Sequence, residues 1–299
     1  MEITPYHPFK SEEKKVKYLE AYDERAKNYP VAADCRMMDT SYGQTFVRIS
    51  GPADAQPLVL LPGFGGDSLI WIPNIEALSE SFRTCAVDNI YDNGRSVYTR
   101  AITSPDDVVK WLDELFNALE LGDNINLMGH SYGGWLTSLY ALRFQNRLNK
   151  IVLLAPAATV LPFRLPFYIY GILMVLPIRY FTKRLFFWLM EDFAKKDEVS
   201  RMWVEEFINN VFMASRCFKS RRPIMPTVLE DQELKSIKVS TLYVVGENEK
   251  IYSAQKAVRR LNQVAPYIQT ETIPNAGHDL AFVQAEMVNE KIIEFLKQS

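Results

Sequence analysis

The chain has 299 residues, of which 48% are hydrophobic and 23% are charged, and its formal net charge is −2. This composition can bury a sizeable core and argues against global disorder, and the length suits one large α/β domain with an insertion. A net charge so close to zero gives no bulk electrostatic attraction to nucleic acid or to an anionic membrane.

The amino terminus lacks the features of a secretory signal, because neither a basic region nor an apolar core precedes its Glu- and Lys-rich stretch. The longest apolar run, residues 167–177, is shorter than the roughly 20 residues that span a bilayer. We therefore expect no stable membrane span and a cytoplasmic location. Cys35, Cys85 and Cys217 are scattered, so we expect buried free thiols rather than disulfides or a metal site.

The first expected elements are a helix and a hairpin. Residues 11–28 indicate a charged helix, and residues 36–40 and 45–49 flank a Ser-Tyr-Gly turn that is typical of a β-hairpin. After the hairpin come short, nearly continuous apolar runs, which are typical of parallel strands buried on both faces. These runs lie at residues 57–61, 84–87, 125–128, 151–154 and 241–245.

Amphipathic helical stretches separate most of these strands, notably at residues 105–119, 132–144 and 254–264, and a further strand-like run lies at 270–273. Strands that alternate with helices predict a doubly wound, mostly parallel sheet. The expected fold class is therefore α/β.

One connection between strands is unusually long. About 80 residues separate the strand ending near Leu154 from the strand starting near Thr241, far more than an ordinary crossover needs. This segment is rich in aromatic residues and prolines. We expect residues 158–236 to form a helical cap inserted into a core of residues 1–157 and 237–299. The cap can be a lid with an apolar roof or a packing subdomain without a substrate role, and its apolar run also permits docking on a membrane surface.

The most informative motif lies at residues 129–133, which read Gly-His-Ser-Tyr-Gly between an expected strand and an expected helix. In a G-x-S-x-G turn of this kind, the serine hydroxyl is exposed above the sheet. A side chain in place of Gly129 or Gly133 would collide with the neighbouring strand or helix. Ser131 is therefore the candidate nucleophile, and the alternative is a glycine-rich turn with an incidental serine.

A serine nucleophile needs a base, and the chain has only 3 histidines. His7 lies in an amino-terminal segment that we expect to be mobile. His130 adjoins Ser131, where the backbone should turn its ring away from the hydroxyl. His278 follows the strand-like run at 270–273, so it belongs to the edge where α/β sheets build their sites. His278 is the candidate base.

A carboxylate must hold the imidazole in the correct tautomer. The loop after the strand at 241–245 offers Glu247 and Glu249, whereas no acid follows the strand that ends near Leu154. We favour Glu249, which lies further into the loop and has more freedom to reach the histidine. Glu247 then caps the strand end or accepts from backbone amides, and Asp279 should point elsewhere.

A loop of small residues at 61–66 can stabilise a developing oxyanion through backbone amides. We expect the amides of Phe64 and Tyr132 to form this hole, with Gly63 in support. The alternative is a plain glycine turn. The loop lacks the G-x-G-x-x-G and G-K-[ST] patterns of nucleotide-binding loops, and no cofactor, metal or nucleic acid is implied.

Taken in order, these motifs resemble the α/β-hydrolase fold superfamily. Residues 62–66 match its oxyanion loop, 129–134 its nucleophile turn, 246–249 its acid loop and 275–278 its base loop. Further matches are Asp88 after the second parallel strand and the Gly-Arg-Ser at 94–96. Two positions depart from the family pattern: Pro62 stands where many relatives have histidine, and Glu249 stands where aspartate is commoner.

Within the superfamily the chain is similar to capped carboxylesterase-like hydrolases. The resemblance implies a serine hydrolase that cleaves a small-molecule carboxylic ester with an apolar acyl or aromatic part. Other reactions on the same triad stay open, namely C–C bond hydrolysis, acyl transfer, perhydrolysis and cofactor-free dioxygenation. A ligand-binding receptor with a vestigial triad stays open too, since fold does not determine function. The sequence says nothing of the oligomeric state.

Overall fold

A mixed β-sheet organises the chain, for which a computed structural model describes residues 3–174, 176 and 178–298. Within these residues the sheet has nine strands in the order β1-β2-β4-β3-β6-β7-β8-β9, and β5 pairs with β2. The strands are β1 (Asp34–Thr40), β2 (Gly43–Ser50), β3 (Pro57–Leu61), β4 (Arg83–Val87), β5 (Val97–Tyr98), β6 (Ile125–His130), β7 (Leu148–Leu154), β8 (Ser240–Gly246) and β9 (Gln269–Ile273).

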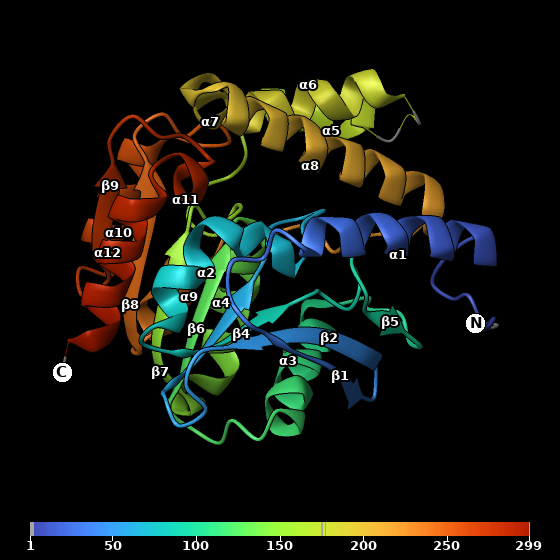
Figure 1. The fold of residues 1–299 in the computed structure, drawn as a ribbon. Helices are drawn as coiled ribbons and strands as arrows, with labels where there is room; N and C mark the ends of the chain where they lie inside the picture. The colour runs from blue at the N-terminus through green and yellow to red at the C-terminus, as the bar shows by residue number, and fades with distance from the viewer. Residues whose placement is uncertain (1–2, 175, 177, 299) are drawn as a thin grey trace.

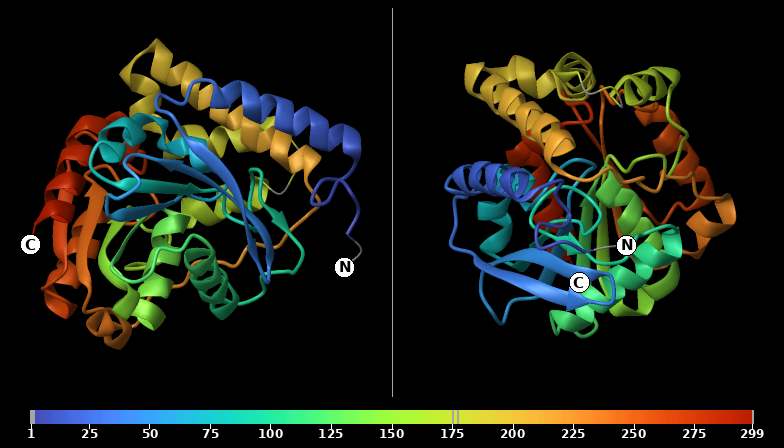
Figure 2. Two further views of the ribbon diagram at one scale, coloured as in Figure 1. Left: turned by 60° about the horizontal axis from the view of Figure 1, so that its bottom comes forward. Right: turned by 90° about the vertical axis from the view of Figure 1, so that its right-hand side faces the viewer.

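The predicted strands are confirmed. Neighbours from β4 through β3, β6, β7 and β8 to β9 pair in parallel, and the predicted hairpin is the antiparallel pair β1–β2. The central strand β6 is buried at every position. Apolar and polar residues do not alternate along this strand, because helices cover both faces of the sheet (Figure 2).

The helices that cover the sheet form two layers. On one face α2 (Ile72–Ser79) packs against α12 (Ala285–Lys297), and on the other α3 (Pro105–Ala118) packs against α4 (Tyr132–Phe144). The predicted helices at 105–119, 132–144 and 254–264 are confirmed. The other helices outside α1 and α5–α8 are η1 (Ser68–Trp71), η2 (Gln145–Arg147), α9 (Asp231–Ser236), α10 (Ala254–Val264) and α11 (Leu280–Val283).

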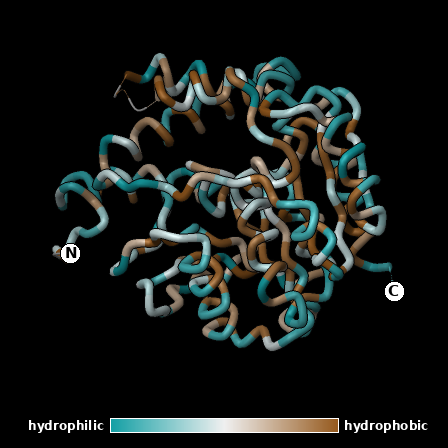
Figure 3. Tube along the Cα trace, turned by 180° about the vertical axis from the view of Figure 1, so that it is seen from behind, coloured by the Kyte–Doolittle hydropathy of each residue, from teal (hydrophilic) through white to brown (hydrophobic). Residues whose placement is uncertain are grey.

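The long connection between β7 and β8 forms a helical insertion, as predicted. It contains α5 (Leu165–Met174), α6 (Arg179–Leu189), α7 (Glu191–Lys196) and α8 (Glu198–Cys217), which lie above the sheet in Figure 1. Helix α6 contacts α5, α7 and α8, whereas α9 packs against α10 of the core. Figure 3 shows that apolar residues fill the strands at the centre and recur along the helices of the insertion.

The amino-terminal helix α1 (Glu12–Ala26) confirms the helix expected at 11–28, and the Ser11 side chain caps it by accepting from the amide of Lys14. The helix lies beside α8. Although most of its residues are charged or polar, one face of the helix points inward, and Tyr18 and Tyr22 on that face are fully buried. The helix is therefore packed into the fold rather than resting on its surface.

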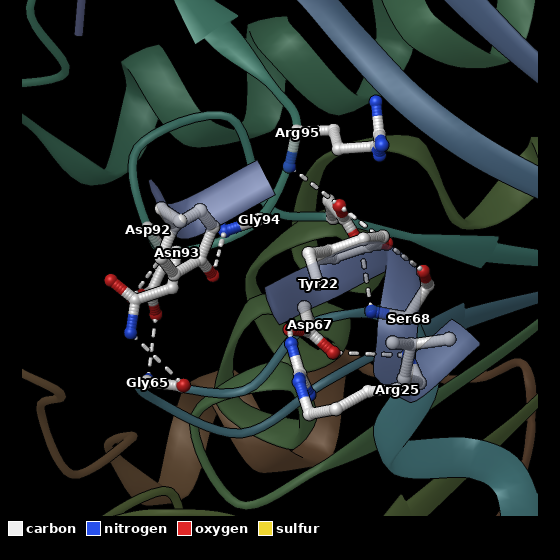
Figure 4. Close-up of polar contacts among 12 residues, drawn as sticks. Tyr22, Arg25, Gly65, Asp67, Ser68, Asp92, Asn93, Gly94 and Arg95 are labelled. Atoms are coloured by element: carbon white, nitrogen blue, oxygen red, sulfur yellow. Dashed lines mark hydrogen bonds and ion pairs between the residues drawn. The ribbon is translucent and has the colours of Figure 1, made fainter. Parts of the chain in front are cut away.

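A buried carboxylate, that of Asp88 directly after β4, joins this strand to α1, and Figure 4 shows the surrounding residues Tyr22, Ser68 and Arg95. The Tyr22 hydroxyl donates to Asp88 Oδ2 at 3.0 Å, and the amides of Ser68 and Arg95 donate to the same carboxylate at 2.7 and 2.8 Å. A Cβ at Gly94, where φ is +118°, would lie 2.4 Å from Asp88 Oδ2. Burial raises the pKa of Asp88 to about 6. Asp88 and Gly94, which both match the family pattern in the sequence, therefore pack closely against each other.

Two expectations from the sequence are wrong. Cys35 is exposed, because β1 is an edge strand whose first residues face solvent, whereas Cys85 and Cys217 are buried as expected. His7 is not in a free segment: its side chain is buried, and its Nε2 donates to the carbonyl of Tyr98 at 2.7 Å. The apolar cluster around Phe9 holds this part of the chain against the core.

Replacing Tyr22 with phenylalanine should lower the free energy of unfolding by about 1–2 kcal/mol, because a buried carboxylate loses a hydroxyl donor while the ring still fills its site. Urea unfolding followed by circular dichroism measures the change. The matched control is Tyr180→Phe, at a side chain that is 60% exposed, which should change stability by less than about 0.5 kcal/mol. Equal effects of the two substitutions would show that the Tyr22 hydroxyl does not stabilise the fold.

Candidate active site

Ser131 lies at a strained turn between β6 and α4. Its φ of 51° and ψ of −112° are unusual for a residue with a side chain, and its amide donates to the carbonyl of Leu154 at 2.8 Å. A Cβ at Gly129 would lie 2.1 Å from the carbonyl oxygen of Gly133, and one at Gly133 would lie 2.1 Å from that of Leu61. Both glycines are therefore required by contact, and the serine hydroxyl stays partly exposed.

The loop after β9 brings His278 to this turn. His278 Nε2 lies 2.8 Å from Ser131 Oγ, and His278 Nδ1 lies 3.0 Å from Glu249 Oε2. The Glu249 side chain is fully buried. The three side chains come from three loops at the carboxyl edge of the sheet and form one continuous hydrogen-bonded chain. In this arrangement the imidazole can accept the proton of the serine hydroxyl.

Three carboxylates belong to the loops around His278, namely those of Glu247, Glu249 and Asp279. Glu249 Oε1 accepts from the amides of Lys250 and Ile251 at 2.7 and 3.0 Å, which fixes the carboxylate in its own loop. Glu247 is exposed and accepts from the amide of Asn275 at 3.4 Å. Asp279 accepts from the amide of Phe193 at 2.7 Å, and burial raises its pKa to about 6. Of these carboxylates, only Glu249 contacts the imidazole.

His130 supports the base loop from the other side. Its Nε2 donates to the carbonyl oxygen of His278 at 2.9 Å, and the two ring centroids are 5.2 Å apart. Burial, together with the positive charge of a protonated His278, lowers the pKa of His130 to about 3. His130 is thus a neutral donor that holds the backbone of His278, and its ring is turned away from Ser131 as expected.

The loop after β3 passes directly over the serine. A Cβ at Gly63 would lie 3.3 Å from Ser131 Cβ, so a side chain at residue 63 would crowd the nucleophile turn. The amides of Phe64 and Tyr132 donate no hydrogen bond to the described residues. Tyr132 is the first residue of α4, where amides have no intrahelical acceptor and the helix dipole is positive. The two amides are available to a negatively charged oxygen.

Side chains that the sequence did not reveal hold the oxyanion loop (Figure 4). Asp92 Oδ2 accepts from the amide of Gly65 at 2.9 Å, and the side-chain amide of Asn93 donates to the carbonyl of Gly65 at 3.1 Å. Arg221, which follows α8, donates to the carbonyl of Asp92 and, at 3.1 Å, to Asn93 Oδ1. Burial raises the pKa of Asp92 to about 6. Both backbone groups of Gly65, next to Phe64, are therefore fixed.

The helical insertion also touches this loop. A Cβ at Gly65 would lie 3.6 Å from Val211 of α8 and 3.8 Å from Phe186 of α6. The ring centroids of Trp203 on α8 and Phe282 on α11 lie 5.5 Å apart. The insertion thus lies close to the loop after β3 and packs on the helix that follows His278.

Two hollows lie near these residues. A narrow, mostly apolar cavity of about 30 Å³ is lined by Phe64, Tyr91, Ile102, Tyr132, Leu136 and Ile224, among others. A larger and more polar cleft of about 550 Å³ is lined by Glu191, Asp192, Glu247 and Glu249, among others. We assign the apolar cavity to the site, because Phe64 and Tyr132, whose amides are available, both line it.

Comparisons with known proteins agree with this architecture. The model of the α/β hydrolase fold family matches residues 56–285. The chain is 34% identical to the uncharacterized carboxylesterase nap of Bacillus subtilis, over 94% of this chain and 92% of that protein, and 32% identical to carboxylesterase YbfK of the same organism, over 96% of each. The crystal structure of naproxen esterase from Bacillus subtilis is similar with a TM-score of 0.86 and 32% identity, over 99% of this chain and 100% of that one. The chain belongs to the α/β-hydrolase fold family.

Proposed function

We propose that this protein is a carboxylesterase in which Ser131 is the nucleophile and His278 is the general base. Glu249 is the triad carboxylate that orients the His278 ring. The observation that carries the proposal is the chain of hydrogen bonds from Ser131 Oγ through the His278 ring to Glu249, with distances of 2.8 and 3.0 Å. Such a chain is what a serine needs to become a nucleophile near neutral pH. The carboxylesterase names of two relatives support an ester as the substrate class.

The proposed reaction has two halves. Ser131 Oγ attacks the ester carbonyl while His278 Nε2 takes its proton, and the Glu249 carboxylate stabilises the imidazolium. The amides of Phe64 and Tyr132 donate to the oxyanion, whose charge is greatest in the transition state. His278 then protonates the leaving alcohol. The acyl group is now bonded to Ser131 Oγ. In the second half, His278 removes a proton from water, which attacks the acyl carbon; the bond to Ser131 Oγ breaks, Oγ takes the proton from His278, and the carboxylic acid is released.

The proposed substrate has an apolar acyl or aromatic part. The apolar cavity beside Tyr132 supports this choice, because it places apolar walls next to the amides that would receive the carbonyl oxygen. We further propose that residues 158–236 act as the lid. The nearness of Val211 and Phe186 to Gly65 supports the lid, because a side chain at position 65 would reach both of them.

Ser131→Ala and His278→Ala should each reduce the hydrolysis of p-nitrophenyl esters by at least about 10³-fold in kcat, and the double variant should lose little more, because the triad acts as a unit. Wild type and variants are compared on esters of graded acyl length, and the optimum length measures the size of the apolar cavity. Thermal unfolding of each variant confirms that the fold is kept.

A well-folded wild-type protein that hydrolyses none of these esters would contradict the proposed function. Activity that survives Ser131→Ala would contradict the proposed nucleophile. Stabilisation by an ester-like ligand without turnover would instead favour a binding role.

Glu249→Gln and Glu247→Gln separate the two candidate acids. In the wild type, the proton on His278 Nδ1 should give a far-downfield proton NMR resonance, because it is donated to a buried carboxylate. The resonance should move upfield in Glu249→Gln, and kcat should fall by at least about tenfold, though by less than in Ser131→Ala. Glu247→Gln is the matched control, and both properties should stay as in the wild type. A larger loss of kcat in the Glu247 variant would identify Glu247 as the acid.

A further inference from the structure

Helix α5 of the insertion is apolar on two opposite faces. Leu165, Tyr168, Ile169 and Ile172 follow the i, i+3, i+4, i+7 spacing of one helix face, and this face is exposed, with Leu165 at 71% and Ile172 at 72%. We call these four residues the α5 patch. The opposite face, which includes Phe167, Tyr170 and Met174, packs on the hydrophobic core. No residue of α5 is fully buried.

The apolar surface continues beyond α5. Leu176, Ile178 and Tyr180 are 46%, 50% and 60% exposed, and Tyr180 begins the outer face of α6. Scattered exposed apolar residues are normal, but several adjoining ones on a single element mark a surface that meets a partner. The α5 patch therefore lacks the water-facing polar side that an ordinary surface helix has.

Basic residues lie beside the patch. The sequence contains no Asp or Glu from residue 124 to residue 190, whereas Arg164, Arg179, Lys183 and Arg184 lie beside or within the two helices. Arg179 and Lys183 share one carboxylate, that of Glu205, and Arg164 lines the polar cleft together with Glu191, Asp192 and Glu247. Arg184 is exposed and takes part in none of the ion pairs among the described residues. The basic rim of the patch thus lies on its α6 side, although the whole chain carries a net charge of −2.

We propose that the α5 patch and its basic rim dock this protein on an anionic lipid surface. A two-fold contact between copies would bring like-charged rims together, whereas anionic headgroups suit the rim and the acyl region suits the patch. Helix α5 has 10 residues and is about 15 Å long. None of the helices in the described ranges is long and apolar enough to cross a bilayer, so α5 lies along the surface. The proposal does not depend on ester hydrolysis.

Co-sedimentation of the full chain with vesicles tests the proposal. One set contains equal parts of phosphatidylglycerol and phosphatidylcholine, and the other contains phosphatidylcholine alone. We expect binding to the anionic vesicles that is at least about tenfold tighter than to the neutral ones and that weakens as salt is raised. Ile169→Ser/Ile172→Ser should weaken it at least about tenfold by removing apolar contact. Arg184→Gln should weaken it about fivefold, because it removes one cation beside the patch.

The matched control is Val199→Ser/Met202→Ser, which removes two apolar side chains of α8 that are 78% and 64% exposed and lie outside the patch. This variant should bind vesicles as the wild type does, and thermal unfolding of every variant confirms that the fold is kept. Absence of binding to anionic vesicles, or binding that the Ile169/Ile172 variant retains, would overturn the proposal. A dimer in light scattering that the same variant dissociates would overturn it too, because the face would then belong to a second copy.

Discussion

The close approach of backbone segments around Ser131 is the constraint on which the rest of the site depends. The end of β6, the start of α4 and the end of β3 come so close that a single Cβ at Gly129 or Gly133 would lie 2.1 Å from a carbonyl oxygen. This crowding holds Ser131 at a φ of 51°, and its amide and carbonyl groups are tied to Leu154 and Ala157 in the neighbouring loop. The strain is maintained because the surrounding sheet over-determines it.

Around this turn, two residues near the site, His278 and Gly65, are each held by hydrogen bonds from two other residues. His130 holds the backbone of His278 while Glu249 contacts its ring, so the candidate base His278 is fixed by residues of β6 and of the β8 loop together. Asp92 and Asn93 fix Gly65 in the same way, by its amide and by its carbonyl. A group held at two points loses little further freedom during a reaction, which is the meaning of a preorganised site.

Much of this architecture could be predicted from the sequence, because its signals are local. The strand-turn-helix around Ser131 and the loops after β8 and β9 each lie within a few residues, and parallel strands bring their ends to one edge. The clamp of Asp92, Asn93 and Arg221 could not be predicted, since up to 129 positions separate its members and no local pattern marks them. The burial of His7, the exposure of Cys35 and the outward face of α5 likewise depend on which surfaces meet after folding, and periodicity alone does not determine this.

The most direct test of the central claim is covalent labelling with an alkyl fluorophosphonate, followed by intact mass and peptide mapping. This reagent reacts with a serine only when a base activates it and an oxyanion site receives its phosphoryl oxygen. The account predicts one adduct per chain, located on Ser131, with labelling at least about 10²-fold slower in His278→Ala. An adduct on another residue, or an unlabelled Ser131 in a protein that still hydrolyses esters, would contradict it.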